Sequence, residues 1–229
     1  MVMTVGPAPG QDFVARLDRV LSSLTNIAMK EQISRFDSER GIPRKLDSFE
    51  TEVSIAEDTE QYTLVRGAHR TYKHVSEIGG LWSFGELVTM LRTTRDILAS
   101  AQDQSVSGDG PSEEIHFQSS ADSRRWFVQA NGRIYWLAFE GMIRISRESG
   151  EIERLTWIAN ENPAETGIGS ILWDFNFHTV PVGNVICTMP SDSVYKVVRK
   201  GANRKPQWNV TTYSALGRYG ATADVSYAQ

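Results

Sequence analysis

Three polar side chains, Asp174, Asn176 and His178, recur at every second position of residues 171–179. A strand would place them on one face, because successive side chains of a strand point to opposite sides. A carboxyl, an amide and an imidazole on one face could support acid–base chemistry. Histidine titrates near neutral pH, so His178 could serve as a general base.

A hydrolase built on this face would take a second carboxylate from another predicted strand. Glycoside hydrolysis needs two carboxyl groups roughly 5–10 Å apart, and either Glu50 or Glu52 could stand beside Asp174. If the protein is an enzyme of glycosides or esters, the predicted catalytic residues are Asp174, His178 and Glu52. The same alternation is typical of any antiparallel strand with one solvated face, which would make these residues a wet outer surface.

The other positions of the same segment are occupied by Ile171, Trp173, Phe175 and Phe177. One face of this strand is therefore predicted to meet an apolar interior, made of helix, core or ligand.

The remaining reactive residues indicate neither a metal site nor a cofactor. His69, His74 and His116 lack metal-ligand spacing, and no glycine-rich phosphate loop occurs. The single cysteine, Cys187, lies in an apolar run, where cysteine behaves as a small hydrophobe. Gly167-Ile-Gly-Ser170 is a near miss for the nucleophile elbow of α/β-hydrolases and fits a loop better.

Charge and hydropathy exclude two classes of protein. The net charge of -4 is spread over 24 basic and 28 acidic residues without a long basic patch, so no nucleic-acid partner is expected. No segment approaches the ~20 apolar residues of a transmembrane helix. Residues 1–10 lack the regions of a signal peptide and are expected to be a flexible terminus or the scar of a removed export signal.

Residues 11–229 are predicted to form a single domain. An amphipathic helix begins near Gln11, and a three-strand meander covers 27–33, 49–55 and 61–66. Ser83 and Glu86 form a capping box for a second helix over 83–99. The turn-rich segment 102–112 is predicted to be a mobile loop.

Almost everything after residue 113 is predicted to be strand. The expected strands are 114–119, 125–130, 133–139, 142–146, 151–159, 171–179, 184–189, 193–199, 208–214 and 223–227. Asn131-Gly132 favours a tight type I′ hairpin. Residues 134–139 of the expected strand 133–139 show no polar side, so this strand is expected to be covered on both faces. Short turns require antiparallel neighbours, so the fold class is α+β with one strongly curved antiparallel sheet.

The order of elements resembles a known family. The second helix carries Gly-x-Trp-x-x-Gly-Glu-x-x-x-Met-Leu, from Gly80 to Leu91. Ser149-Gly-Glu-Ile-Glu-Arg154 and Asn209-Val-Thr-Thr-Tyr-Ser-Ala-Leu-Gly-Arg-Tyr219 follow in matching order. This pattern is similar to a family of exported, uncharacterised proteins of soil bacteria. The topology resembles the LolA-like lipoprotein-carrier fold, an open antiparallel half-barrel whose helices plug a hydrophobic concavity.

That resemblance implies a periplasmic or secreted protein that binds acyl chains or lipidated partners. An open sheet of this size encloses a space that side chains, helices or an acyl chain must fill, and each buried methylene contributes roughly 0.8 kcal/mol. The candidate ligand-binding residues are Trp82, Phe84, Leu87, Met90, Leu91, Trp136, Trp173, Phe175 and Phe177. The alternative is that these residues are plain core, because pockets and cores are both apolar.

The sequence therefore favours a noncatalytic binding or carrier domain for a hydrophobic small molecule or a lipidated protein, without cofactor or metal. A glycoside or ester hydrolase and a cell-envelope protein-interaction module are the two alternatives.

Overall fold

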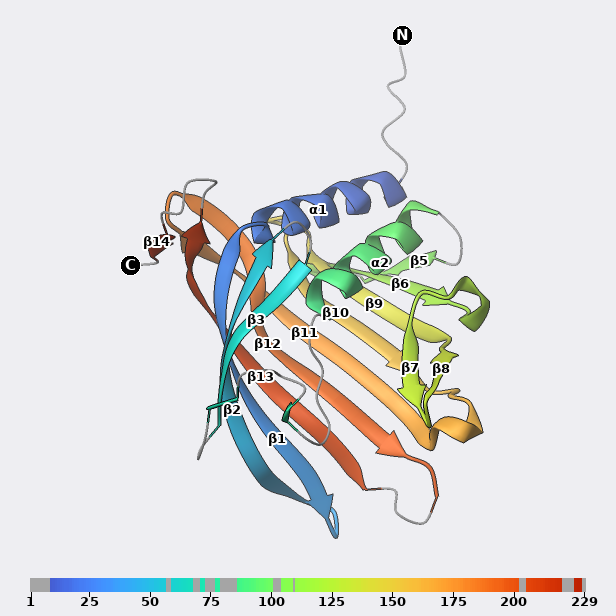
Figure 1. Cartoon of the computed structure of the whole chain (residues 1–229). Helices are drawn as coiled ribbons and strands as arrows, with labels where there is room; N and C mark the ends of the chain where they lie inside the picture. Colours follow the sequence, from blue (N-terminus) through green and yellow to red (C-terminus); the bar gives the residue numbers. More distant parts are fainter. Residues whose placement is uncertain are drawn as a thin grey trace.

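The structure is a computed structural model in which two helices lie in the concave side of one large, curved antiparallel sheet (Figure 1). The described residues are 9–56, 59–67, 71–72, 77–78, 86–100, 104–108, 110–201, 205–219 and 225–227. The predicted α+β open half-barrel is confirmed, because the sheet curves without closing and ends in β4 on one side and β5 on the other.

The helices are α1 (Pro9–Leu24) and α2 (Leu87–Ala99). The long strands of the first half are β1 (Ile27–Glu39), β2 (Ile42–Ala56) and β3 (Thr59–Gly67). The shorter strands that follow are β4 (Thr71–Tyr72), β5 (Gln104–Ser107), β6 (Ser112–Ser119), β7 (Phe127–Ala130) and β8 (Arg133–Trp136). The remaining strands are β9 (Phe139–Ser146), β10 (Ile152–Ala159), β11 (Ile168–Val182), β12 (Val185–Arg199), β13 (Pro206–Tyr219) and β14 (Val225–Tyr227).

The strand order joins the two ends of the chain. Along the main sheet it runs β4-β3-β2-β1-β13-β12-β11-β10-β9-β6-β5, with β14 paired to β13 and with β7 and β8 in a separate two-stranded sheet. β1 pairs with β2 on one side and with β13 on the other, from Ile27 opposite Arg218 to Asp37 opposite Gln207. The amino-terminal meander is therefore attached to the carboxy-terminal hairpins by one long seam.

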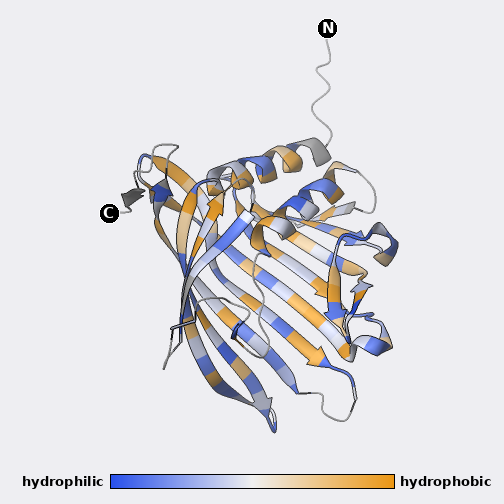
Figure 2. Ribbon diagram, viewed as in Figure 1, coloured by the Kyte–Doolittle hydropathy of each residue, from blue (hydrophilic) through white to orange (hydrophobic). Residues whose placement is uncertain are grey.

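Hydrophobic and hydrophilic residues alternate along the long strands, as Figure 2 shows, and the hydrophobic phase faces the helices. On α1, four buried residues recur at intervals of three and four and form its inner face: Phe13, Leu17, Val20 and Leu24. Burying a side chain of this size contributes about 1.5–3 kcal/mol, so this face holds the helix against the sheet. Across the two helices, the Arg95 Nε donates a hydrogen bond to Asp18 over 3.0 Å.

Trp157 on β10 is the centre of the aromatic core. Its indole stacks on Phe139 with ring centroids 4.1 Å apart, and its Nε1 donates to the Thr94 hydroxyl of α2 over 3.0 Å. Next to it, Gly141 leaves room for the Phe117 ring, because an added Cβ would lie 2.1 Å from that ring's Cζ. The hydrogen bond fixes α2 to the sheet, and the glycine lets the rings pack beneath it.

Several local predictions are confirmed. The three-strand meander is present as β1, β2 and β3. Asn131 and Gly132 have φ angles of 52° and 71°, the left-handed values that a type I′ hairpin requires. Among the described helices, none has the length and apolar character needed to cross a membrane.

Other predictions are wrong. The expected strand 133–139 is divided between β8 and β9, and Ile134 is 56% exposed rather than covered, because β7 and β8 form a ribbon outside the main sheet. The expected loop 102–112 contains β5, which pairs with β6. α2 begins at Leu87, with Glu86 at the N-cap position and without a side-chain capping bond, so the predicted capping box does not place Glu86 correctly. Ser83 lies outside the described residues.

Candidate functional site

The predicted polar face of β11 lies on the outer, convex side of the sheet, opposite the helices. Asp174 accepts hydrogen bonds from Arg154 Nε over 2.7 Å and from the Thr156 hydroxyl over 2.8 Å. Asn176 donates to Asp192 over 2.7 Å, and the His178 side chain is exposed. The neighbouring carboxylate raises the pKa of Arg154. Asp174 and Asn176 are therefore engaged in cross-strand hydrogen bonds on the outer face.

The structure does not bring the predicted catalytic residues together. Glu52 is exposed on β2, and three strands, β1, β13 and β12, lie between β2 and β11. Four strand spacings correspond to about 19 Å along the sheet, well beyond the separation of a catalytic carboxylate pair. Glu50 forms an ion pair with Lys30 over 2.8 Å.

The inner face changes from polar to apolar across the sheet. The strand pairing places one row of directly opposed residues from β1 to β6: Arg35, Asn209, Tyr195, Trp173, Trp157, Gly141 and Phe117. A parallel row contains Ile33, Thr211, Ser193, Phe175, Leu155, Ile143 and Ile115. In these two rows β1, β13 and β12 carry charged, amide and hydroxyl groups together with Ile33, whereas β11, β10, β9 and β6 carry only aromatic and aliphatic side chains and one glycine.

A small cavity lies where the two halves of the inner face meet, below the amino-terminal end of α2. We call it the acidic pocket; its lining residues are Glu31, Glu60, Tyr62, Glu86, Leu87, Trp173, Phe175, Ser193, Thr211 and Tyr213. Its volume is about 20 Å³, enough for about one water molecule. No arginine, lysine or histidine occurs among the described residues that line it.

Glu60 connects β3 to α2. Its Oε1 accepts the backbone N–H of Val88 over 2.8 Å, and its Oε2 accepts the Tyr62 hydroxyl over 2.9 Å. Val88 is in the first turn of α2, where backbone N–H groups lack partners within the helix and the helix dipole favours a negative charge. Glu60 therefore caps α2 from a strand distant in sequence.

The other two carboxyl groups of the pocket lie in surroundings that disfavour charge. Burial, with a smaller contribution from the charge of Glu60, raises the pKa of Glu31 to about 8. The same two causes, in the same order, raise the pKa of Glu86 to about 7. Glu31 is 6% exposed, and within the described part of the chain its carboxyl has neither a hydrogen bond nor an ion pair.

The hydroxyl groups of the pocket form a second polar layer. The Ser193 hydroxyl and the Tyr213 hydroxyl are 2.9 Å apart and share a hydrogen bond. Burial, followed by the charge of Glu31, raises the pKa of Tyr213 well above its ordinary value, so this phenol stays neutral and can donate or accept. Among the described residues, no group of three histidine, cysteine, aspartate or glutamate side chains is arranged to hold a metal ion.

The predicted ligand-binding residues have different positions. Three of them line the acidic pocket: Leu87, Trp173 and Phe175. Three others are buried in the core: Met90, Leu91 and Phe177. Trp136 lies on β8, with its ring 5.2 Å from that of Phe127. Trp82 and Phe84 lie outside the described residues. Contact of any of these residues with a ligand stays a prediction.

The sequence contained a signal for one acidic residue of the pocket. Ile27, Met29 and Ile33 alternate in the inward phase of β1, and Glu31 is a charged residue in that same phase. A charge at an inward position is uncommon unless it is paired or functional. Glu60 and Glu86 had no such signal, because they reach the pocket through the placement of β3 and α2.

Comparison with known proteins gives structural likenesses only. No family model and no curated protein matches the chain. The chain is similar to a LolA superfamily protein from Nitrosomonas europaea, with a TM-score of 0.35, 6% identity, and coverage of 94% of this chain and 93% of the other. The order of elements predicted from the sequence resembles the LolA-like fold.

Two further solved structures are similar to the chain. A DUF1329 family protein from Desulfovibrio piger gives a TM-score of 0.36 at 9% identity, with the same coverages of 94% and 93%. The MucA/MucB complex of Pseudomonas aeruginosa gives 0.23 at 10% identity, over 89% of this chain and 94% of the other. TM-scores of this size carry no argument about function, so the half-barrel architecture rests on the strand pairing itself.

Proposed function

We propose that this protein is a noncatalytic binding or carrier domain for a hydrophobic ligand of the acyl-chain type, in the periplasm or outside the cell. The observation that supports it is the mixed lining of the acidic pocket. Leu87, Trp173 and Phe175 form its apolar side, and they continue into the aromatic inner face of β11 and β10. A ligand with a long apolar part and one polar end matches this lining.

Binding of such a ligand requires α2 to move. The pocket has room for about one water molecule, and the apolar residues beyond it are in contact with the helices. A ligand chain would therefore displace the part of α2 around Thr94 from β10 and β11, where the bond between Trp157 and Thr94 now holds the helix, while the first turn of α2 stays at the acidic pocket. The cost of exposing the inner face of α2 is offset because the chain buries the same strands.

Hydrolysis by Asp174, His178 and Glu52 is the competing prediction, and we do not propose it. Asp174 is engaged with Arg154 and Thr156 on the outer face, and Glu52 is several strands away. A general base must lie within hydrogen-bonding reach of the proton that it removes, and a catalytic pair must share one substrate.

Tryptophan fluorescence tests the proposal. Long-chain alcohols brominated along the chain quench nearby indoles, so titration with them should quench the tryptophan fluorescence of the protein and raise its melting temperature. Trp173→Phe should remove a large part of the quenching, because Trp173 lines the pocket. Trp208→Phe is the matched control, since Trp208 stacks on Phe36 and points away from the inward Asn209.

Two results would contradict the proposal. The first is the absence of both quenching and stabilisation by every chain tested, together with no lipid in an organic extract of the purified protein. The second is equal quenching of the two tryptophan variants, which would place the chain elsewhere on the surface.

A further inference from the structure

We propose that the acidic pocket recognises a cationic head group, so that the preferred ligand is an apolar chain ending in a protonated amine. This inference rests on the proposed function, which supplies the apolar chain, and adds the chemistry of its polar end. Three carboxyl groups from three separate elements, β1, β3 and the N-cap of α2, meet in this pocket.

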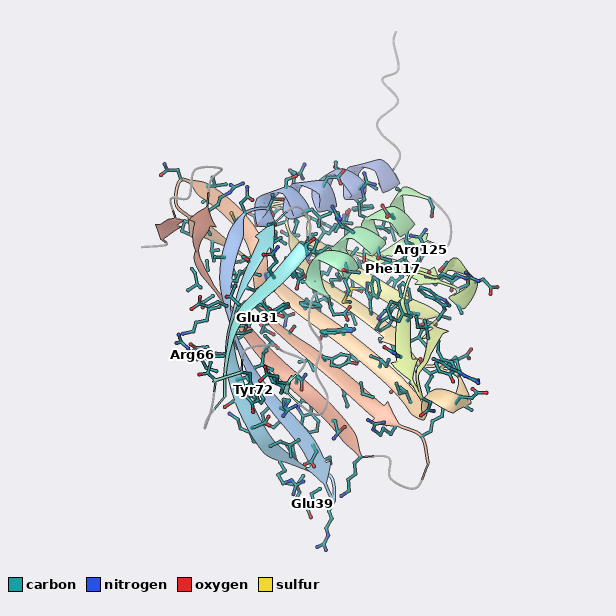
Figure 3. All side chains as sticks on the ribbon, in the orientation of Figure 1. Glu31, Glu39, Arg66, Tyr72, Phe117 and Arg125 are labelled. Atoms are coloured by element: carbon teal, nitrogen blue, oxygen red, sulfur yellow. The ribbon has the colours of Figure 1, made fainter. Side chains whose placement is uncertain are left out.

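The buried, unpaired carboxyl of Glu31 is the observation that points to a ligand. Glu31, labelled on β1 in Figure 3, is 6% exposed and lines the cavity. It has no hydrogen bond or ion pair to any residue that the structure describes. Burying a carboxyl group costs free energy when no hydrogen-bond donor or cation is close enough to replace the water that it loses. A ligand that brings positive charge and N–H donors supplies what the protein leaves out.

The rest of the lining suits an amine better than other polar groups. Tyr213, Ser193 and Thr211 add hydroxyl oxygens that can accept from an ammonium group. A carboxylate head group would instead face Glu31, Glu60 and Glu86 without a described cation to offset the repulsion.

Glu60 differs from the other two carboxyl groups of the pocket, because its hydrogen-bond partners within the protein are already in place. Its carboxylate already accepts hydrogen bonds from the Val88 N–H and the Tyr62 hydroxyl, which fix its position. Glu31 and Glu86, by contrast, are free to change protonation, since burial and the charge of Glu60 raise their pKa values to about 8 and about 7. An arriving cation would offset these effects and stabilise both carboxylates.

Binding of the amine should therefore release protons to the solvent near neutral pH. The groups that face Glu31 in the pocket are Glu60, Glu86, Tyr62 and Tyr213, and burial raises the pKa of the Tyr213 phenol well above its ordinary value. Calorimetry in two buffers with different ionisation enthalpies measures the release directly. We expect a positive number of protons for the amine and about none for an uncharged alcohol of the same length.

The deciding experiment compares dodecylamine, dodecanol and dodecanoate, below their aggregation concentrations, by tryptophan fluorescence. Wild-type protein should bind the amine about tenfold or more tightly than the alcohol, and the carboxylate most weakly. Glu31→Gln should abolish most of the preference for the amine over the alcohol, because it removes the carboxylate that would pair with the ammonium group. Glu86→Gln should reduce the preference in the same direction.

Glu52→Gln is the matched control, because it makes the same substitution on the exposed outer face of β2. It should keep the full preference for the amine. Equal affinities of wild-type protein for amine and alcohol, or an undiminished preference in folded Glu31→Gln, would overturn the inference while leaving the proposed function intact. If none of the three chains binds, the proposed function fails together with this inference.

Discussion

Glu31 is a carboxyl held in surroundings that favour its neutral form. Its pKa in the folded protein is about 8, against 4.5 for an unperturbed glutamate. Below pH 4.5 the folded and the unfolded chain both carry its proton. As the pH rises toward about 8, the unfolded chain releases the proton and the folded chain retains it. The free energy of unfolding must therefore fall across this window and become level above it.

Glutamine at position 31 should remove most of that fall. Glu31→Gln keeps the shape and the hydrogen-bonding capacity of the neutral acid but does not titrate. We expect the variant to be more stable than wild type at about pH 8 by on the order of a few kcal/mol, and similar at about pH 5. Urea unfolding at the two pH values measures this. Glu86→Gln should act in the same direction over the narrower interval up to about pH 7.

The exposed Glu52 provides the comparison for this series, and Glu52→Gln should follow the wild-type curve at both pH values. If Glu31→Gln instead loses the same amount of stability at about pH 5 and at about pH 8, the destabilisation does not depend on the protonation of Glu31. The carboxyl group would then make a specific stabilising contact that glutamine cannot replace.

At the scale of elements, α2 depends on a residue that lies outside it. Leu87 follows directly from Glu86, which makes no side-chain capping bond, and the nearest described acceptor for the first turn is the carboxylate of Glu60 on β3. An acceptor at this position typically contributes about 0.5–2 kcal/mol, and a negative charge adds to it through the helix dipole. Two contacts therefore hold α2 against the sheet. One is the Glu60 carboxylate at its first turn, and the other is the hydrogen bond between Trp157 and Thr94 in the core.

Removal of the Glu60 carboxylate should loosen α2 selectively. In Glu60→Ala we expect faster amide hydrogen exchange in α2, by a factor corresponding to about 1 kcal/mol, with exchange in α1 unchanged. Glu60→Gln, which keeps an acceptor without the charge, should give a smaller acceleration. Mass spectrometry of the exchanged peptides distinguishes the helices. Equal acceleration of α1 and α2 would mean that the variant loosens the whole core and that Glu60 has no specific capping role.

Elements with a strong local pattern were predictable. The alternation at Trp173 and Phe175 correctly indicated the inward face of β11, and Asn131 with Gly132 correctly indicated a hairpin. The start of α2 was not predictable from its own residues, because its acceptor, Glu60, is supplied by another element. The prediction that Ile134 is covered was also wrong. An apolar residue in a strand does not indicate whether a second layer of structure covers it.

At the scale of the whole molecule, the sheet depends on the seam between β1 and β13. This pairing brings together residues from opposite ends of the chain, such as Ile33 and Thr211, whereas Ile143 and Leu155 meet across a short hairpin. No local pattern encodes the seam, because alternation defines the inward face of a strand and not its neighbour. The acidic pocket could not be predicted from the sequence for the same reason, because the pairing of β1 with β13 is what places Glu31 opposite Tyr213.

The seam should form late in folding, since it closes the longest loop of the chain. Ile33→Val and Ile143→Val both shorten a buried isoleucine by one methyl group and should each cost about 0.5–1.5 kcal/mol. We expect the first to accelerate unfolding with little change in the folding rate, and the second to slow folding. Stopped-flow kinetics over a range of urea concentrations separates these effects. The opposite assignment of the two variants would place the seam in the folding nucleus.

The two edge strands of the half-barrel bear on whether the protein aggregates at high concentration. A sheet that never closes leaves a row of unpaired backbone groups at each side, and such rows invite strand-by-strand polymerisation with other copies. Here the margins are β4, of two residues, and β5, of four, next to neighbours that are much longer. Short edge strands offer few backbone groups for pairing with a strand of another molecule. The sheet can therefore stay open without promoting edge-to-edge aggregation.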